Sequence, residues 1–138
     1  HTYDAPGSYT ATLTVTDDAG AKDSVGMTIE IFGAMTGAVH VAGISLVAVS
    51  VPGGTTAEAT VIIVDGNGLP RPGATVSGQW SGAVSGSSTA VTGADGIAVL
   101  TSKKTRADGS ITFTIFDVAA TGYIYDPSLN QTSSATLP

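Results

Sequence analysis

The chain has 138 residues, of which 42% are hydrophobic and only 12% are charged, and its formal net charge is −6. This length fits one or two small domains rather than a large enzyme, and five Lys and Arg residues are too few for the clustered phosphate contacts of a nucleic-acid-binding protein. The absence of Cys excludes disulfides, thiolate zinc sites and cysteine nucleophiles.

Residues 9–16 alternate between apolar and threonine side chains, with the apolar residues at every odd position. This period of two predicts a half-buried strand with one solvated face. Residues 17–20 predict a turn and residues 25–31 alternate again, so we expect an antiparallel hairpin. An isolated hairpin cannot cover its own apolar face. We expect it to be completed by earlier strands of the same protein, by a neighbouring chain as in a donor-strand polymer, or by residues 38–138.

A second unit is expected to begin near Ala38, after a linker at residues 32–37. Turns that contain Gly, Asn, Asp or Pro separate its alternating segments and predict seven short strands. The expected strands span residues 39–50, 57–64, 73–80, 87–92, 97–102, 110–118 and a segment within 123–136. Seven short strands in about 100 residues are typical of an immunoglobulin-like β-sandwich.

One long stretch has no charged side chain, between Glu30 and Glu58. Its length would suffice for a membrane span of about 20 apolar residues. However, it contains several Gly and Ser residues, and residues 39–51 are rich in Val and Ile, which favour strands. The composition therefore predicts a strand and no membrane insertion.

The first segment carries a recognisable pattern, because residues 1–10 read HTYDAPGSYT and residues 13–20 read LTVTDDAG. This pattern looks like the C-terminal third of a PKD domain, over residues 1–31. The family's earlier Trp-Asp-Phe-Gly-Asp-Gly motif does not occur here. The resemblance implies a partial PKD-like β-sandwich at residues 1–33. With neither a Met start nor a signal peptide, the sequence is expected to be a piece of a longer protein.

The second segment contains two further motifs, VIIVDGNGLPRPGATV at residues 61–76 and TGADGIAVL at residues 92–100. They resemble bacterial Ig-like modules of invasin and adhesin type, over residues 38–130. Trp80 and the Tyr-Asp-Pro at residues 125–127 are similar to a subgroup at the C-termini of large secreted bacterial proteins, some of them proteases. The fold expected is therefore all-β, with an immunoglobulin-like β-sandwich at residues 34–138 preceded by the partial PKD-like β-sandwich. Both resemblances imply an extracellular, non-enzymatic module.

Catalytic and cofactor-binding residues are not expected, because His1 and His40 are the only imidazoles and no Gly-x-Ser-x-Gly motif occurs. No metal is expected either, although calcium takes oxygen ligands of the kind found in these turns. The possible calcium ligands are Asp17, Asp18, Asp65 and Asn67, with Asp4 or Asp23 for a site between the domains. Ordinary turn chemistry accounts for the same residues.

Three aromatic residues are candidates for ligand contact. Trp80, the only Trp, is expected in the core between the sheets, with Gln79 pointing outward, and the alternative is a platform for sugar rings or collagen. Tyr123 and Tyr125 share a strand face and are the better surface candidates.

Two polar segments allow a structural and a functional interpretation. Lys103, Lys104 and Arg106 hold three of the five positive charges and predict either a solvated loop or a contact with an acidic partner. The sequence Asn-Gln-Thr at residues 130–132 matches a glycosylation acceptor.

The function expected is that of a structural or adhesion module, either a spacer or a building block of a filament or surface layer. The alternative is a polysaccharide- or collagen-binding accessory domain of a secreted hydrolase or protease. The expected partners are neighbouring domains of the same chain and, in these two cases, other copies of the protein or a polymer. The expected location is secreted or at the bacterial cell surface.

Overall fold

The computed structural model describes residues 7–31 and 37–138. The described chain is built from strands, with one short 3₁₀ helix near its C-terminal end, and none of its helices is long and apolar enough to cross a membrane. It divides into two compact units, His1–Ala34 and Met35–Pro138. The all-β class predicted from the sequence is confirmed.

The first unit contains a hairpin of β1 (Gly7–Thr16) and β2 (Lys22–Ile31), as the alternating pattern predicts. The register sets Tyr9 opposite Ile29 and Leu13 opposite Val25, so the apolar side chains of both strands share one face. The threonines share the other face. The prediction of a hairpin with one apolar face is therefore confirmed.

This apolar face is open in the described structure. Leu13, Val15, Val25 and Met27 are each at least 60% exposed. Four such side chains on one short hairpin form an apolar surface that a folded protein ordinarily covers. What completes the hairpin stays a prediction.

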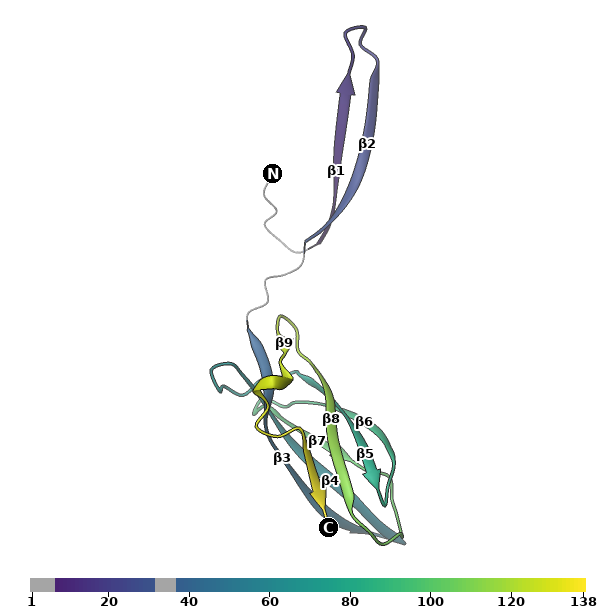
Figure 1. Ribbon diagram of the computed structural model, residues 1–138, viewed down its shortest axis with the longest axis vertical. Helices are drawn as coiled ribbons and strands as arrows, with labels where there is room; N and C mark the ends of the chain where they lie inside the picture. The colour runs from purple at the N-terminus through teal and green to yellow at the C-terminus, as the bar shows by residue number, and fades with distance from the viewer. Residues whose placement is uncertain (1–6, 32–36) are drawn as a thin grey trace. The chain divides into compact units, whose positions relative to one another are not determined.

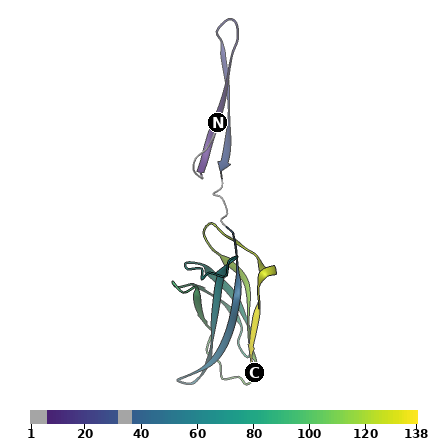
Figure 2. The same ribbon diagram turned by 90° about the vertical axis from the view of Figure 1, so that its left-hand side faces the viewer.

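The second unit consists of two four-stranded sheets (Figures 1 and 2). The first sheet has the order β7-β4-β3-β9, and the second has the order β10-β8-β5-β6. The strands of the first sheet are β3 (Ala38–Val51), β4 (Gly54–Asp65), β7 (Ile97–Thr101) and β9 (Ile124–Tyr125). Those of the second are β5 (Thr75–Gly82), β6 (Gly86–Val91), β8 (Ile111–Ala119) and β10 (Ser134–Leu137).

The connections between the sheets follow the immunoglobulin scheme. The chain crosses from β4 to β5, returns from β6 to β7, and crosses again to β8, so that β3, β4 and β7 face β5, β8 and β10. The segment at residues 123–136 contains β9, the 3₁₀ helix η1 (Pro127–Leu129) and β10 rather than one strand. All the other predicted strands are present.

The charge-free stretch of the sequence forms β3, as predicted, and not a helix. A bulge at Ala42 shifts its register against β4 between Val41 and Gly43. Only Ala38 and Val39 pair with β9, so most of the strand has a partner on one side alone (Figure 1).

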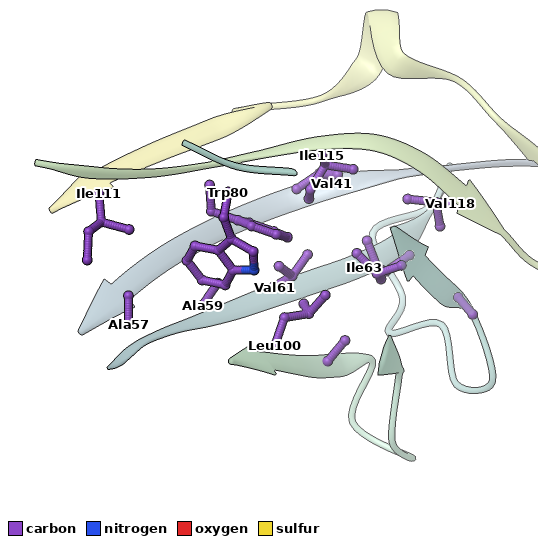
Figure 3. Packing of buried hydrophobic residues seen from close by; sticks show 14 of the residues in the cluster. Val41, Ala57, Ala59, Val61, Ile63, Trp80, Leu100, Ile111, Ile115 and Val118 are labelled. Carbon is purple, nitrogen blue, oxygen red and sulfur yellow. The ribbon is translucent and has the colours of Figure 1, made fainter. Parts of the chain in front are cut away.

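The core lies between the two sheets and is formed by inward-facing side chains from strands of both sheets and by residues of the adjoining loops (Figure 3). On β4 every second residue from Ala57 to Ile63 is fully buried, as the period of two requires. The buried cluster comprises Val39, Val41, Ala57, Ala59, Val61, Ile63, Ala74, Val76, Trp80, Val84, Ala98, Leu100, Ile111, Phe113, Ile115 and Val118.

Candidate functional site

Trp80 lies in the core and not on a surface platform. Its side chain on β5 is 2% exposed, and its ring packs against that of Phe113 with 4.5 Å between the centroids. The indole Nε1 donates a hydrogen bond of 2.8 Å to the Ser88 hydroxyl, so its one donor is satisfied. Gln79 is exposed. The prediction of a core Trp is confirmed, and this ring has no free face for a ligand.

Tyr123 and Tyr125, predicted as surface candidates, are half-buried and pack against the core cluster. The guanidinium of Arg71 lies 3.9 Å from the centre of the Tyr123 ring, in a cation–π contact, and also donates to the carbonyl of Thr121. Between the two tyrosines, Ile124 is 55% exposed. The exposed side of β9 is thus aliphatic, and the aromatic rings face inward.

Asn130, the predicted glycosylation acceptor, is occupied by internal hydrogen bonds. Its Oδ1 accepts from the backbone N–H of Val41 at 2.8 Å. Its Nδ2 donates to the hydroxyl of Tyr125 at 2.7 Å and to that of Ser133 at 3.1 Å. Since one amide fastens the C-terminal segment to β3, its contacts indicate a structural role.

The calcium candidates in the second unit serve a turn. The Asp65 Oδ1 accepts from the backbone N–H groups of Asn67 and Leu69, at 2.8 and 3.1 Å. A carboxylate that bonds the backbone two and four residues further on is the usual means by which Asp stabilises such a turn.

In the first unit, the carboxylates of Asp17 and Asp23 also accept from the nearby backbone. The Asp17 Oδ1 accepts from the N–H groups of Ala19 and Ala21, and that of Asp23 accepts from the next residue, Ser24. Asp4 lies outside the described residues. Among residues 7–31 and 37–138 no three His, Asp or Glu side chains gather as metal ligands would.

Asp126 has a lowered pKa. Its Oδ1 accepts from the Ser128 hydroxyl at 2.6 Å and from the Ser128 N–H at 3.0 Å, which caps η1. These two hydrogen bonds, together with the nearby His40, hold the pKa of Asp126 below its ordinary value of 3.8. The carboxylate therefore acts as a helix cap.

The basic loop is fastened to the turn between β3 and β4. Arg106 donates from Nε to the carbonyl of Gly53 at 2.6 Å, and Lys104 donates from Nζ to that of Pro52 at 3.3 Å. A backbone bridge between Thr55 and Thr105 joins the same two segments. Two of the three cations thus hold the loop in place. All three side chains are exposed, and binding of an acidic partner stays a prediction.

Phe116, which the sequence analysis did not single out, is the only exposed aromatic side chain in the described part of the chain, at 59%. It lies on β8 where the register against β5 shifts, between Ile115 and Asp117. Phe116 faces outward in alternation with Phe113 and Ile115, and the extra residue at the bulge leaves Asp117 exposed as well before Val118 returns to the core. The signal in the sequence is Ile115 followed directly by Phe116, which interrupts strict alternation.

The remaining candidates for catalysis do not converge. His40 is half-buried on β3, with its Nδ1 enclosed and without a hydrogen-bond partner among the described residues. Ser85 lies in an exposed turn, and Ser102 is buried with its hydroxyl bonded to the backbone of Ala57 and Lys103. No nucleophile, base and orienting group meet here in the described part of the chain.

Comparison with known families assigns the first unit. Residues 1–32 match the PKD domain family. PKD domains occur typically in extracellular and surface proteins, so the match indicates an extracellular module of a multidomain protein. It ends before β3, and the bacterial Ig-like assignment of the sandwich at residues 34–138 therefore rests on the motifs alone. No curated protein and no solved structure is significantly similar to the chain.

Proposed function

We propose that this chain is a non-enzymatic structural module of a multidomain bacterial protein, which holds neighbouring domains apart outside the cell. The observation that carries the proposal is the placement of the sandwich's ends. β3 begins at one end of the sandwich, and the chain terminates at the other, where Figures 1 and 2 mark the C-terminus. Domains joined to the two ends are thus separated by the length of the sandwich.

The strand order makes this arrangement resistant to pulling. β3 is hydrogen-bonded to β4 along the ladder from Val39 to Val51, parallel to the line between the two ends. A force on the ends therefore loads the bonds of this ladder together, in shear, rather than one after another. The dry core behind it, with Val41, Leu46 and Ala59 facing inward, adds apolar contacts that must break at the same time.

Single-molecule force spectroscopy on the full chain, held at its two ends, tests the spacer role. We expect a distinct rupture peak for the sandwich. In the variant Ser45→Cys with Thr60→Cys, two directly opposite positions, a disulfide pins β3 to β4. The oxidised variant should rupture at higher force and the reduced variant as the unmodified chain does. Extension without a rupture peak would contradict the proposal.

Binding of a polymer is the second candidate function, and the exposed Phe116 favours it. Aromatic side chains stack on sugar rings, and the outer face around Phe116 carries hydroxyl groups, among them those of Thr112 and Thr114. Co-sedimentation with insoluble chitin, cellulose or collagen tests this function. Binding that is lost in Phe116→Ala but kept in Val91→Ala, which is 60% exposed on the same face, would identify an accessory binding domain. Hydrolysis of any of these polymers would contradict a non-enzymatic role.

A further inference from the structure

We propose that the free edge of β3, from Gly43 to Val51, pairs antiparallel with the same edge of a second copy of this chain. The two sheets then join into one, in the order β7-β4-β3-β3-β4-β7. This inference rests on the proposed structural role and extends it, because it names the partner with which the module assembles.

The backbone of this edge has unused hydrogen-bonding groups. Ala48 lies opposite Ala57, whose N–H and C=O both bond to Ser102 on the far side of β4. In an antiparallel pair, the backbone N–H and C=O groups of two opposite residues either all point toward the partner strand or all point away from it. Since those of Ala57 point away from β3, the N–H and C=O of Ala48 point away from β4, to the free edge.

The same alternation applies along the strand. At the start of β3, the backbone N–H and C=O of Val41 bond to Asn130 and Gln131 and therefore also point away from β4. Beyond the bulge, the residues that share the orientation of Ala48 are Ile44, Leu46 and Ser50. None of these four has a backbone partner on that side within the described chain, and β10 pairs with β8 instead.

This edge lacks the features by which proteins normally prevent edge pairing. It has no charged residue and no Pro from Gly43 to Val51, and its bulge lies before the open part. Val47 and Ala48 are exposed. The other edges of the sandwich are shorter, since β10, β7 and β6 have four, five and six residues. Seven or more consecutive residues of this composition form a strong pairing segment.

The absence of charge favours a second copy as the occupant. In a two-fold pair, the segment lies against itself, so any charge near its centre would oppose its own copy. The nearest acid is Glu58 on β4, opposite Val47. The two Glu58 side chains would lie three strand spacings apart, about 14 Å, which exceeds the Debye length of about 8 Å in physiological salt. The repulsion between these two carboxylates is therefore largely screened.

One register uses all the unpaired backbone N–H and C=O groups of this edge. With Val47 opposite its own copy, Leu46 pairs with Ala48 and Ile44 pairs with Ser50, and the backbone groups of these four residues point to the edge. Each such pair exchanges two hydrogen bonds, giving about eight across the interface. Opposite residues keep the same face, so the inward and outward sides of both sheets remain continuous.

The mass of the full chain in solution gives the first test. Sedimentation should yield twice the monomer mass of 13.6 kDa. Ala48→Pro removes an N–H that has no internal partner, so the fold should persist by circular dichroism while the mass falls to that of the monomer. Val47→Lys should also give a monomer, since it places two cations against each other. Val99→Lys, the same change at a 49% exposed position on β7, should leave the dimer intact.

A cross-link tests the register. The chain has no Cys, so one introduced thiol is unambiguous. Val47→Cys places two thiols directly opposite, with about 4.5 Å between Cα atoms in a non-hydrogen-bonded pair, which is within disulfide range. It should cross-link on mild oxidation. The two copies of Val49→Cys would lie four residues apart along the strands, about 13 Å, and should not.

The open hairpin face supplies the outcome that would overturn the pairing. If Leu13→Lys abolishes the dimer and Ala48→Pro does not, the apolar face of β1 and β2 is the interface. A monomeric chain, or equal cross-linking at Val47 and Val49, also overturns the proposal. A monomer would leave the spacer role intact, whereas loss of the rupture peak would remove that role and leave the pairing intact.

Discussion

Trp80 and Phe113 lie directly opposite each other on β5 and β8, and their rings pack at an angle of 45°. Figure 3 shows the Trp80 ring directed toward Ala59 on the facing sheet. Small side chains on β4 thus leave room for the largest side chain of the core. The indole thus fills the space between the two sheets of a sandwich that has no disulfide.

Replacing Trp80 with Ala should lower the free energy of unfolding by about 3–5 kcal/mol, because burial is lost and a cavity remains. Chemical denaturation followed by circular dichroism measures the change. Ser88→Ala removes only the partner of the indole N–H and should cost about 1–3 kcal/mol. An unchanged stability in Trp80→Ala would show that the ring is not part of the core.

Gly78→Ala should also destabilise the fold, by about 1–3 kcal/mol, through overpacking. Gly78 lies on β5 beside Phe113, and a Cβ added there would overlap the Phe113 ring. Gly66→Ala is the matched control, since its new Cβ would meet no atom within 4 Å. Melting temperatures of the two variants give the comparison, and an equal effect of both would contradict the close approach.

The strands could be predicted from the sequence because alternation and turn residues are local signals. Apolar side chains occupy every second position from Tyr9 to Val15 and from Ala57 to Ile63, which is the period of a strand with one apolar face. The open face of the hairpin followed from the same reasoning. These features need no knowledge of residues far along the chain.

The rest depends on contacts between distant residues. Which way Tyr123 and Tyr125 face is decided by Arg71 and Asn130, and neither partner is recognisable from the local pattern. The bulge that leaves both Phe116 and Asp117 on the outer face depends on the register against β5. Likewise, the split of the last segment into β9, η1 and β10 depends on hydrogen bonds from Asn130 to β3.

Asn130→Ala should loosen the C-terminal segment from β3. It removes the acceptor for the Val41 N–H and the donor to Tyr125, and leaving such groups without partners costs about 1–3 kcal/mol. Hydrogen exchange should show faster exchange at the Val41 and Gln131 amides. Asn67→Ala, in the exposed turn after β4, should leave both amides as they are. Protection unchanged in both variants would contradict the role of this amide.

Stability should depend on pH through Asp126. The lowered pKa means that the folded chain favours the ionised carboxyl, so its contribution is present above the ordinary value of 3.8. That contribution is lost as the pH falls from 3.8 through the lowered pKa of the folded state. The carbon chemical shift of the Asp126 carboxyl, followed by NMR against pH, measures this pKa directly.

Ser128→Ala removes the hydroxyl that lowers the pKa of Asp126 most, so the midpoint of the NMR titration should move up toward 3.8. It should not reach that value, because the Ser128 N–H still donates to the carboxylate. Asp126→Asn cannot ionise, and the stability difference between it and the unmodified chain should therefore shrink as the pH falls below 3.8. A difference that stays constant down to pH values well below 3.8 would mean that the cap of η1 does not require the ionised carboxylate.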